Sequence, residues 1–372
     1  MGLLVCELVL RLVSHGSDIM PMIPTPDPIL GWRLPPLQSG LDARGFRNIT
    51  AEGDFPIVCI GDSMIYGAGL PFRYAVPQQM SLMLGELVYN MGGPAYGPIQ
   101  YYQLFKESRN MHPRKTIIAI FMGNNLLKAY FMAYQHEHWK WLVNESGDDN
   151  QLQTMSRCSL PVDFAKIDFQ YLDPEKVLLH SSNKGGSFVR AVHEFLSSHS
   201  AIYANLYERM VKPLVQKRLQ LPGVYFYSTA IDTVFVPGGN LRYLDLQDNR
   251  VRRGLLITKK IIELLSTEQR GNHDLLFTIL PTKENVYYNF LKSKNIALPN
   301  EFECCVHYER EISRWLNNVI KSNGFGFIDV FPPLEKGATD GVLLYNHLSD
   351  CHLNAEGSRI VAKTICNALK NN

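Results

Sequence analysis

The chain has 372 residues, of which 46% are hydrophobic and 11% aromatic, and its formal net charge is +2. This composition predicts a globular protein with a large core, built as two domains or as one domain with a large insertion. Only 19% of the residues are charged, which argues against nucleic-acid binding because that function needs a clustered basic surface. We therefore expect a small or neutral partner and no nucleic acid.

The seven cysteines form an odd set without a CxxC pair, so neither a zinc ribbon nor a disulfide framework is predicted. Cys59 and Cys366 lie in apolar runs, which is typical of small core residues. The adjacent Cys304 and Cys305 could be redox-active, but we favour two ordinary cysteines.

The first 13 residues are apolar but are interrupted by Glu7 and Arg11, and a helix needs about 20 apolar residues to span a bilayer. They also lack the basic start and cleavage site of a signal peptide. Weak membrane association through residues 1–13 and a helix packed on the domain both stay open, as do cytoplasmic and cell-envelope locations. The proline-rich sequence that follows makes residues 1–50 an extended lead-in over the surface.

An apolar run at residues 57–60 ends in a small polar turn that contains Gly61, Asp62 and Ser63. The run predicts a buried parallel strand whose carboxyl end presents Ser63, at the edge where α/β sheets carry their chemistry. A serine hydroxyl becomes a strong nucleophile only when a base takes its proton and donors hold the oxyanion. The turn therefore predicts such groups elsewhere in the chain; the alternative is an ordinary strand-to-helix turn with a capping side chain.

Strand and helix patterns alternate after this turn, which implies right-handed crossovers and a parallel sheet. Ser63, the loop that contains Ala95, and Asn124 are then expected at one edge of the sheet. Further strands are predicted at 87–90, 116–121, 275–280 and 325–330, and helices at 76–87, 312–320 and 360–369.

Residues 126–272 break this alternation, and we interpret them as an insertion or a cap over the sheet edge. His136 and His138 could bind a metal ion, but without further ligands nearby they are more typical of a surface. The patterns in this region predict helices at 187–198, 202–219 and 251–265 and a β element around 224–244.

Asp350 and His352 are separated by one residue and precede a predicted helix. If their loop returns to the sheet edge, His352 can take the proton of Ser63 while Asp350 accepts from the other ring nitrogen. A single Asp-x-His pair is weak evidence of catalysis by itself. It gains weight because it follows the Ser63 turn in the chain and stands directly before a predicted helix.

These motifs resemble those of the SGNH, or GDSL, hydrolase family. The first block matches Gly61-Asp62-Ser63 and Gly67, and the last matches Asp350-Cys351-His352. The third falls on Met122-Gly123-Asn124-Asn125, and the second puts the family's oxyanion glycine on Ala95. The flanks 30–33, 45–48, 281–284 and 286–287 also look like bacterial members, so the resemblance covers residues 30–125 and 275–370.

The resemblance implies a flavodoxin-like, three-layer α/β/α sandwich with a mainly parallel five-stranded sheet. Residues 51–125 and 273–372 would form the core of this hydrolase, with no metal and no cofactor required. The implied reaction is hydrolysis of an ester-linked acyl group, such as acetyl or another short acyl, on a small molecule or a carbohydrate.

In the implied mechanism Ser63 attacks, His352 acts as base and then as acid, and Asp350 orients His352. The oxyanion would meet the backbone N–H groups of Ser63 and Ala95 and the side-chain amide of Asn124. Candidates for contacts with the substrate are Asp62, Gly93, Asn125 and Lys283.

Three positions depart from the family pattern: Ala95 and Met122 replace glycine, and Asn125 replaces an acidic residue. Two other functions stay open, and these departures motivate the second of them. One is an O-acyltransferase that passes the same acyl-enzyme to a carbohydrate hydroxyl, and the other is a non-catalytic scaffold with a decayed site.

Overall fold

The computed structural model describes most of the chain. Three predictions lie outside the described residues: those for residues 1–13, for the helix at 187–198 and for most of the helix at 202–219. The described residues are 24–38, 40–147, 149–153, 155–162, 200, 202–203, 226–268, 274–346 and 350–371. No helix among them is long and apolar enough to cross a membrane.

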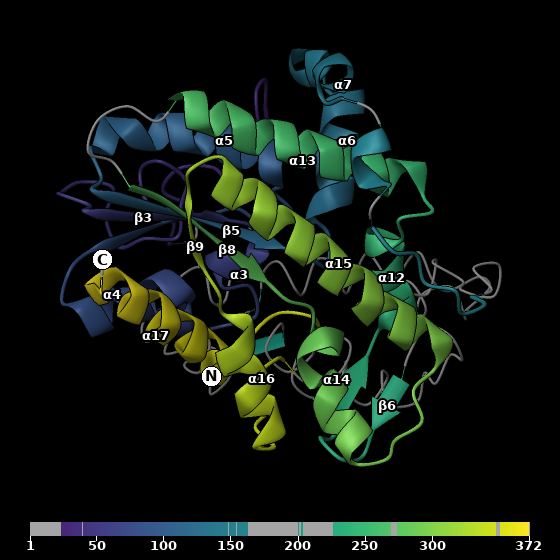
Figure 1. The fold of residues 1–372 in the computed structure, drawn as a ribbon. Helices are drawn as coiled ribbons and strands as arrows, with labels where there is room; N and C mark the ends of the chain where they lie inside the picture. Colours follow the sequence, from purple (N-terminus) through teal and green to yellow (C-terminus); the bar gives the residue numbers. More distant parts are fainter. Residues whose placement is uncertain are drawn as a thin grey trace, which may run out of the picture.

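The centre of the fold is a five-stranded sheet in which every neighbouring pair is parallel (Figure 1). Its strand order is β4-β3-β5-β8-β9, the flavodoxin-like order. The predicted sheet is thus confirmed. The strands are β3 (Ile57–Gly61), β4 (Val88–Gly92), β5 (Lys115–Phe121), β8 (Asp274–Leu280) and β9 (Gly326–Ile328).

Helices cover both faces of the sheet because its strands are apolar on both sides: along β5, Ile118 and Ile120 join one core cluster and Ile117 the other. One face carries α5 (Pro98–Ser108), α6 (Asn125–Gln135), α13 (Asn249–Glu268) and α15 (Asn300–Ser322) (Figure 1). The other carries α3 (Ser63–Tyr66), α4 (Val76–Leu84), α14 (Lys283–Ser293), α16 (Phe331–Thr339) and α17 (Ala355–Asn371).

Helices α4 and α15 differ in length from their predictions. Helix α4 ends at Leu84 because Gly85 takes the left-handed conformation, with φ 69°. Helix α15 starts earlier than its strongest apolar pattern, directly after Pro299. Shorter elements are η1 (Phe72–Tyr74), η2 (Arg109–Met111), η3 (Glu137–Trp139), α7 (Trp141–Glu145) and η4 (Asp149–Leu152).

The described part of the lead-in packs into the fold, whereas the sequence pattern suggested an extended passage over the surface. Strands β1 (Thr25–Asp27) and β2 (Gly31–Arg33) form an antiparallel hairpin. Farther along, the buried Arg47 donates to the carbonyls of Tyr66, Gly67 and Leu70 at 3.1, 2.7 and 2.7 Å. Carbonyls at a helix end need such donors, so the lead-in completes α3.

The predicted insertion contributes α6 and α13 to one helical layer, so part of it continues the regular alternation. Strands β6 (Phe226–Ser228) and β7 (Thr233–Phe235) form an antiparallel hairpin, and α12 (Pro237–Leu244) follows where the pattern suggested more β structure. The carboxylate of Glu284 accepts from Val236 N at 2.7 Å and Asn240 Nδ2 at 2.6 Å. The hairpin and α12 are therefore fixed beside the carboxyl end of β8.

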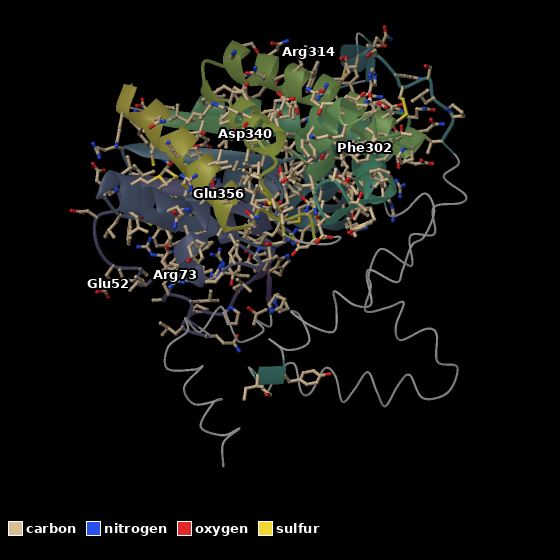
Figure 2. All side chains as sticks on the ribbon, turned by 90° about the horizontal axis from the view of Figure 1, so that it is seen from below. Glu52, Arg73, Phe302, Arg314, Asp340 and Glu356 are labelled. Carbon is tan, nitrogen blue, oxygen red and sulfur yellow. A yellow bond between two sulfur atoms is a disulfide. The ribbon has the colours of Figure 1, made fainter. Side chains whose placement is uncertain are left out.

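A disulfide joins Cys158 to Cys304, although the cysteine spacing predicted none (Figure 2). The partners are 146 residues apart, so no local pattern could reveal the pair. The bond ties the segment after η4 to α15. The neighbouring Cys305 is a free, buried thiol whose pKa is raised by burial, as expected for a core cysteine.

Candidate active site

Ser63 is the first residue of α3, and only Asp62 separates it from the end of β3 at Gly61. A Cβ on Gly61 would lie 2.4 Å from Ile65 Cγ1, so the turn has room for glycine alone. Asp62 is buried and its carboxylate accepts from Met64 N at 2.9 Å, which caps α3. Burial raises the pKa of Asp62 to about 6, against the lowering effect of that hydrogen bond.

The structure brings Ser63, His352 and Asp350 into one chain of hydrogen bonds. His352 Nε2 lies 2.8 Å from Ser63 Oγ, and His352 Nδ1 lies 2.6 Å from Asp350 Oδ1. The backbone N–H of His352 also donates to Asp350 Oδ1 at 2.9 Å. With Nδ1 donating to Asp350, Nε2 is the ring nitrogen that can accept the serine proton.

Asp350 is set up to remain ionised. Burial on its own would raise the pKa of this carboxyl group, but the nearby charge of His352 and the hydrogen bonds that Asp350 accepts lower it to about 2. A carboxylate that stays negative at neutral pH can stabilise an imidazolium on His352.

The backbone N–H groups of Ser63 and Ala95 both lie at this edge, and neither donates to a described residue. Ala95 has φ 63°, in the left-handed region that disfavours residues with a Cβ. It is the third residue of a turn closed by the bond from Tyr96 N to Gly93 O at 3.0 Å, as in type II turns. The strained residue thus presents its N–H in the loop that follows β4.

Asn124 stands at the N-cap of α6, in the loop after β5. Its side-chain oxygen accepts from Asn125 Nδ2 at 2.7 Å, and its own Nδ2 donates to no described residue. The loops of Ser63, Ala95 and Asn124 follow three adjacent parallel strands, so these donors lie at one edge of the sheet.

Asn125, a candidate for substrate contact, is buried and bonded inside the protein. Its oxygen accepts from Phe121 N and from the hydroxyl of Tyr101, both at 2.9 Å. Its Nδ2 reaches Asp62 Oδ2 at 3.3 Å and Tyr96 O at 3.5 Å. We therefore assign Asn125 to holding the three loops together.

The other candidates for substrate contact also have internal roles. A Cβ on Gly93 would lie 2.2 Å from the ring of Tyr96, so Gly93 makes room for that ring. Lys283 is only 2% exposed, and its ammonium donates to three acceptors of the protein. Asp62, as described above, is a buried helix cap.

Sequence reasoning missed two residues that touch the triad loop. Asn346 donates from Nδ2 to Asp350 Oδ2 at 3.1 Å. Gly69 has φ 75°, and a Cβ there would lie 2.7 Å from Asn346 Nδ2. No motif marks either position, because each matters only through a contact made in the folded chain.

The arrangement does not favour a metal ion. Among the described residues, Asp350, Cys351 and His352 form a group of potential ligands whose atoms lie within 4.8 Å of one another. Both imidazole nitrogens are already hydrogen-bonded, however, and burial raises the pKa of Cys351, so a thiolate is disfavoured there. The geometry instead suits proton transfer between Ser63 and His352.

No protein-family model matches the sequence, and no curated protein matches it. Its structural neighbours are G-D-S-L family lipolytic proteins. A member of the lipolytic protein G-D-S-L family from Veillonella parvula DSM 2008 is 11% identical, with a TM-score of 0.38 over 85% of this chain and 98% of that one. A protein assigned to the same family from Desulfitobacterium hafniense DCB-2 is 10% identical, with a TM-score of 0.37 over 84% and 97%.

Proposed function

We propose that this protein is a serine hydrolase that cleaves an ester-linked acyl group, with acetyl or another short acyl as the transferred group. The observation that carries the proposal is the hydrogen-bonded chain from Ser63 Oγ through His352 to Asp350, with distances of 2.8 and 2.6 Å. Hydroxyl, imidazole and carboxylate in this order make a serine nucleophilic at neutral pH.

In the proposed reaction Ser63 Oγ attacks the ester carbonyl while His352 Nε2 takes the serine proton. The charge of Asp350 stabilises the imidazolium that forms. The tetrahedral intermediate collapses when His352 returns the proton to the departing alcohol, which leaves an acyl-enzyme on Ser63. A water molecule then attacks with His352 as its base, and the acid is released as the serine regains its proton.

The oxyanion of each tetrahedral intermediate would accept hydrogen bonds from the backbone N–H groups of Ser63 and Ala95 and from Asn124 Nδ2. All three donors are unused by the described residues, which supports this role. Removing one such donor costs about 10²–10³ in kcat.

The test is to incubate the purified protein with p-nitrophenyl esters of increasing acyl length and, separately, with a fluorophosphonate. We expect turnover of short esters and a covalent label that peptide mass spectrometry places on Ser63. Folded protein that neither turns over esters nor takes the label would support the scaffold alternative. Adding polysaccharide acceptors tests transfer, since an acyltransferase would move the acyl group to the acceptor and release less free acid.

We also propose that the protein matures in an oxidising compartment, which among the two locations left open favours the cell envelope. The support is the disulfide between Cys158 and Cys304, a bond rare in reducing compartments. Non-reducing peptide mapping of protein from its native source should recover the two linked peptides, and recovery of both as free thiols would refute the proposal.

A further inference from the structure

Asn346 contacts both Asp350 and His352, the carboxylate and the base of the proposed mechanism. Asn346 Nδ2 donates to Asp350 Oδ2 at 3.1 Å, and Asn346 N donates to the carbonyl of His352 at 2.8 Å. The first bond uses the carboxylate oxygen that His352 Nδ1 leaves open, since the imidazole bonds to Oδ1. Asn346 thereby limits rotation of the carboxylate and fixes the backbone that carries the imidazole.

The position of Asn346 is in turn fixed by a buried ammonium group. Lys283 Nζ donates to Asn346 O at 3.0 Å, to Thr233 Oγ1 at 2.6 Å and to Val234 O at 3.1 Å. An ammonium has three N–H donors and is costly to bury unless they are bonded, so these acceptors match its needs. Burial also lowers the pKa of Lys283 to about 8, while the charges of Glu284 and Asp350 act against that shift.

The surroundings leave the side chain of Asn346 little freedom. The missing Cβ of Gly69 provides the space that Asn346 Nδ2 occupies. On the other side, Tyr345 forms an antiparallel bridge with Leu353, and its hydroxyl donates to Pro281 O at 2.8 Å. The loop that enters the triad is thus bonded to the segment in which Lys283 lies.

We propose that Asn346 and Lys283 are positioning residues, which hold Asp350 against His352 and couple the β6–β7 hairpin of the insertion to this pair. The inference rests on the proposed function and deepens it. Neither residue reaches substrate in this role. Their loss lets the carboxylate turn away from Nδ1, so the proton transfer slows while substrate binding is retained.

The first test compares Asn346→Ala and Lys283→Met with Lys292→Met, which removes an exposed ammonium from the same helix, α14. We expect kcat to fall about tenfold to 100-fold in the first two, with KM within about twofold, and no change in the control. In an Asp350→Ala background, Asn346→Ala should add no further loss, because its effect passes through Asp350. Wild-type kcat in folded Asn346→Ala, or full additivity of the losses, would overturn the inference.

A second readout does not depend on activity. The His352 Nδ1 proton, hydrogen-bonded to Asp350, should give a far-downfield proton NMR signal that Asp350→Ala removes. We expect Asn346→Ala and the milder Lys283→Gln to shift or broaden this signal, whereas Lys292→Met leaves it in place. An unchanged signal in both variants refutes the positioning role. Wild-type protein that shows the signal but neither turns over esters nor reacts with the fluorophosphonate refutes the proposed function alone.

Discussion

The side-chain amide of Asn125 donates to the carboxylate of Asp62 across 3.3 Å, and both side chains are fully buried. The contact joins the loop after β5 to the loop after β3, next to Ser63. The same amide nitrogen lies 3.5 Å from Tyr96 O in the loop after β4. A carboxylate at position 125 has no proton to donate at neutral pH, so an amide at this position suits a site in which Asp62 is buried.

Asn125→Asp should therefore destabilise the protein. Two buried carboxylates would face each other, and burial already raises the pKa of Asp62 to about 6. We expect the free energy of unfolding at pH 8 to fall by about 3 kcal/mol, measured by urea denaturation. At pH 5 the loss should be smaller, because a proton shared by the two groups restores a donor. The exposed Asn318→Asp should change stability by less than about 0.5 kcal/mol, and equal effects of both variants would contradict this role.

Ser63→Ala and His352→Ala should each abolish nearly all esterase activity. Because the hydroxyl and the imidazole act as one unit, we expect each loss in kcat to be about 10⁴-fold or more, and the double variant to be little worse than either single variant. Steady-state kinetics with a short p-nitrophenyl ester measures the losses, and circular dichroism checks that the variants fold. If the loss in kcat of the double variant equals the product of the two single losses, the two residues act in separate steps.

The sequence was most informative where function and fold depend on local pattern. An apolar run marks the strand before Ser63, and a short motif marks Asp350 and His352. The carboxyl ends of parallel strands meet at one edge of the sheet, which places the loops after them together. The role of Arg47 and the bond between Cys158 and Cys304 were not predictable, because each depends on a partner far along the chain. Substrate contact stays a prediction for the polar residues beside these motifs; in the folded protein Asp62, Asn125 and Lys283 are buried and hydrogen-bonded to other protein groups.

Asn124→Ala isolates the proposed oxyanion donor. The side-chain oxygen of Asn124 accepts one bond, from Asn125, and its Nδ2 bonds to no described residue, so truncation should leave the fold largely intact. We expect kcat to fall about 10²–10³-fold with little change in KM, since the donor acts on charge that develops in the transition state. Asn124→Asp, which presents a negative charge to the oxyanion, should be at least as impaired. A variant that loses only affinity for the ester would assign Asn124 to substrate binding instead.

Ala95→Gly should relieve backbone strain while keeping the N–H group. A left-handed residue with a Cβ costs about 1–2 kcal/mol, and Ala95 has φ 63°. Glycine loses more conformational entropy on folding, so we expect a net gain in the free energy of unfolding of up to about 1 kcal/mol, with kcat retained. Ala133→Gly, inside helix α6, should have the opposite sign. Destabilisation by Ala95→Gly would mean that the methyl group is needed for packing.

The stability of the folded state should depend on Asp350 in a defined acidic window. Its pKa is lowered from 3.8 to about 2 in the folded protein, where the lowering by His352 and hydrogen bonds exceeds the raising effect of burial. A lowered carboxyl pKa adds stability that is fully present above pH 3.8 and disappears as the pH falls from 3.8 towards 2. The side chain is 36% exposed, so solvent screening limits the contribution to about 1 kcal/mol. Urea denaturation should therefore show that wild type and Asp350→Asn differ in the free energy of unfolding by an amount that is constant from pH 6 to 5. This difference should become smaller as the pH falls below about 4. If the difference in the free energy of unfolding between the two proteins stays constant down to pH 3, the folded protein does not favour the charged form of this carboxyl group.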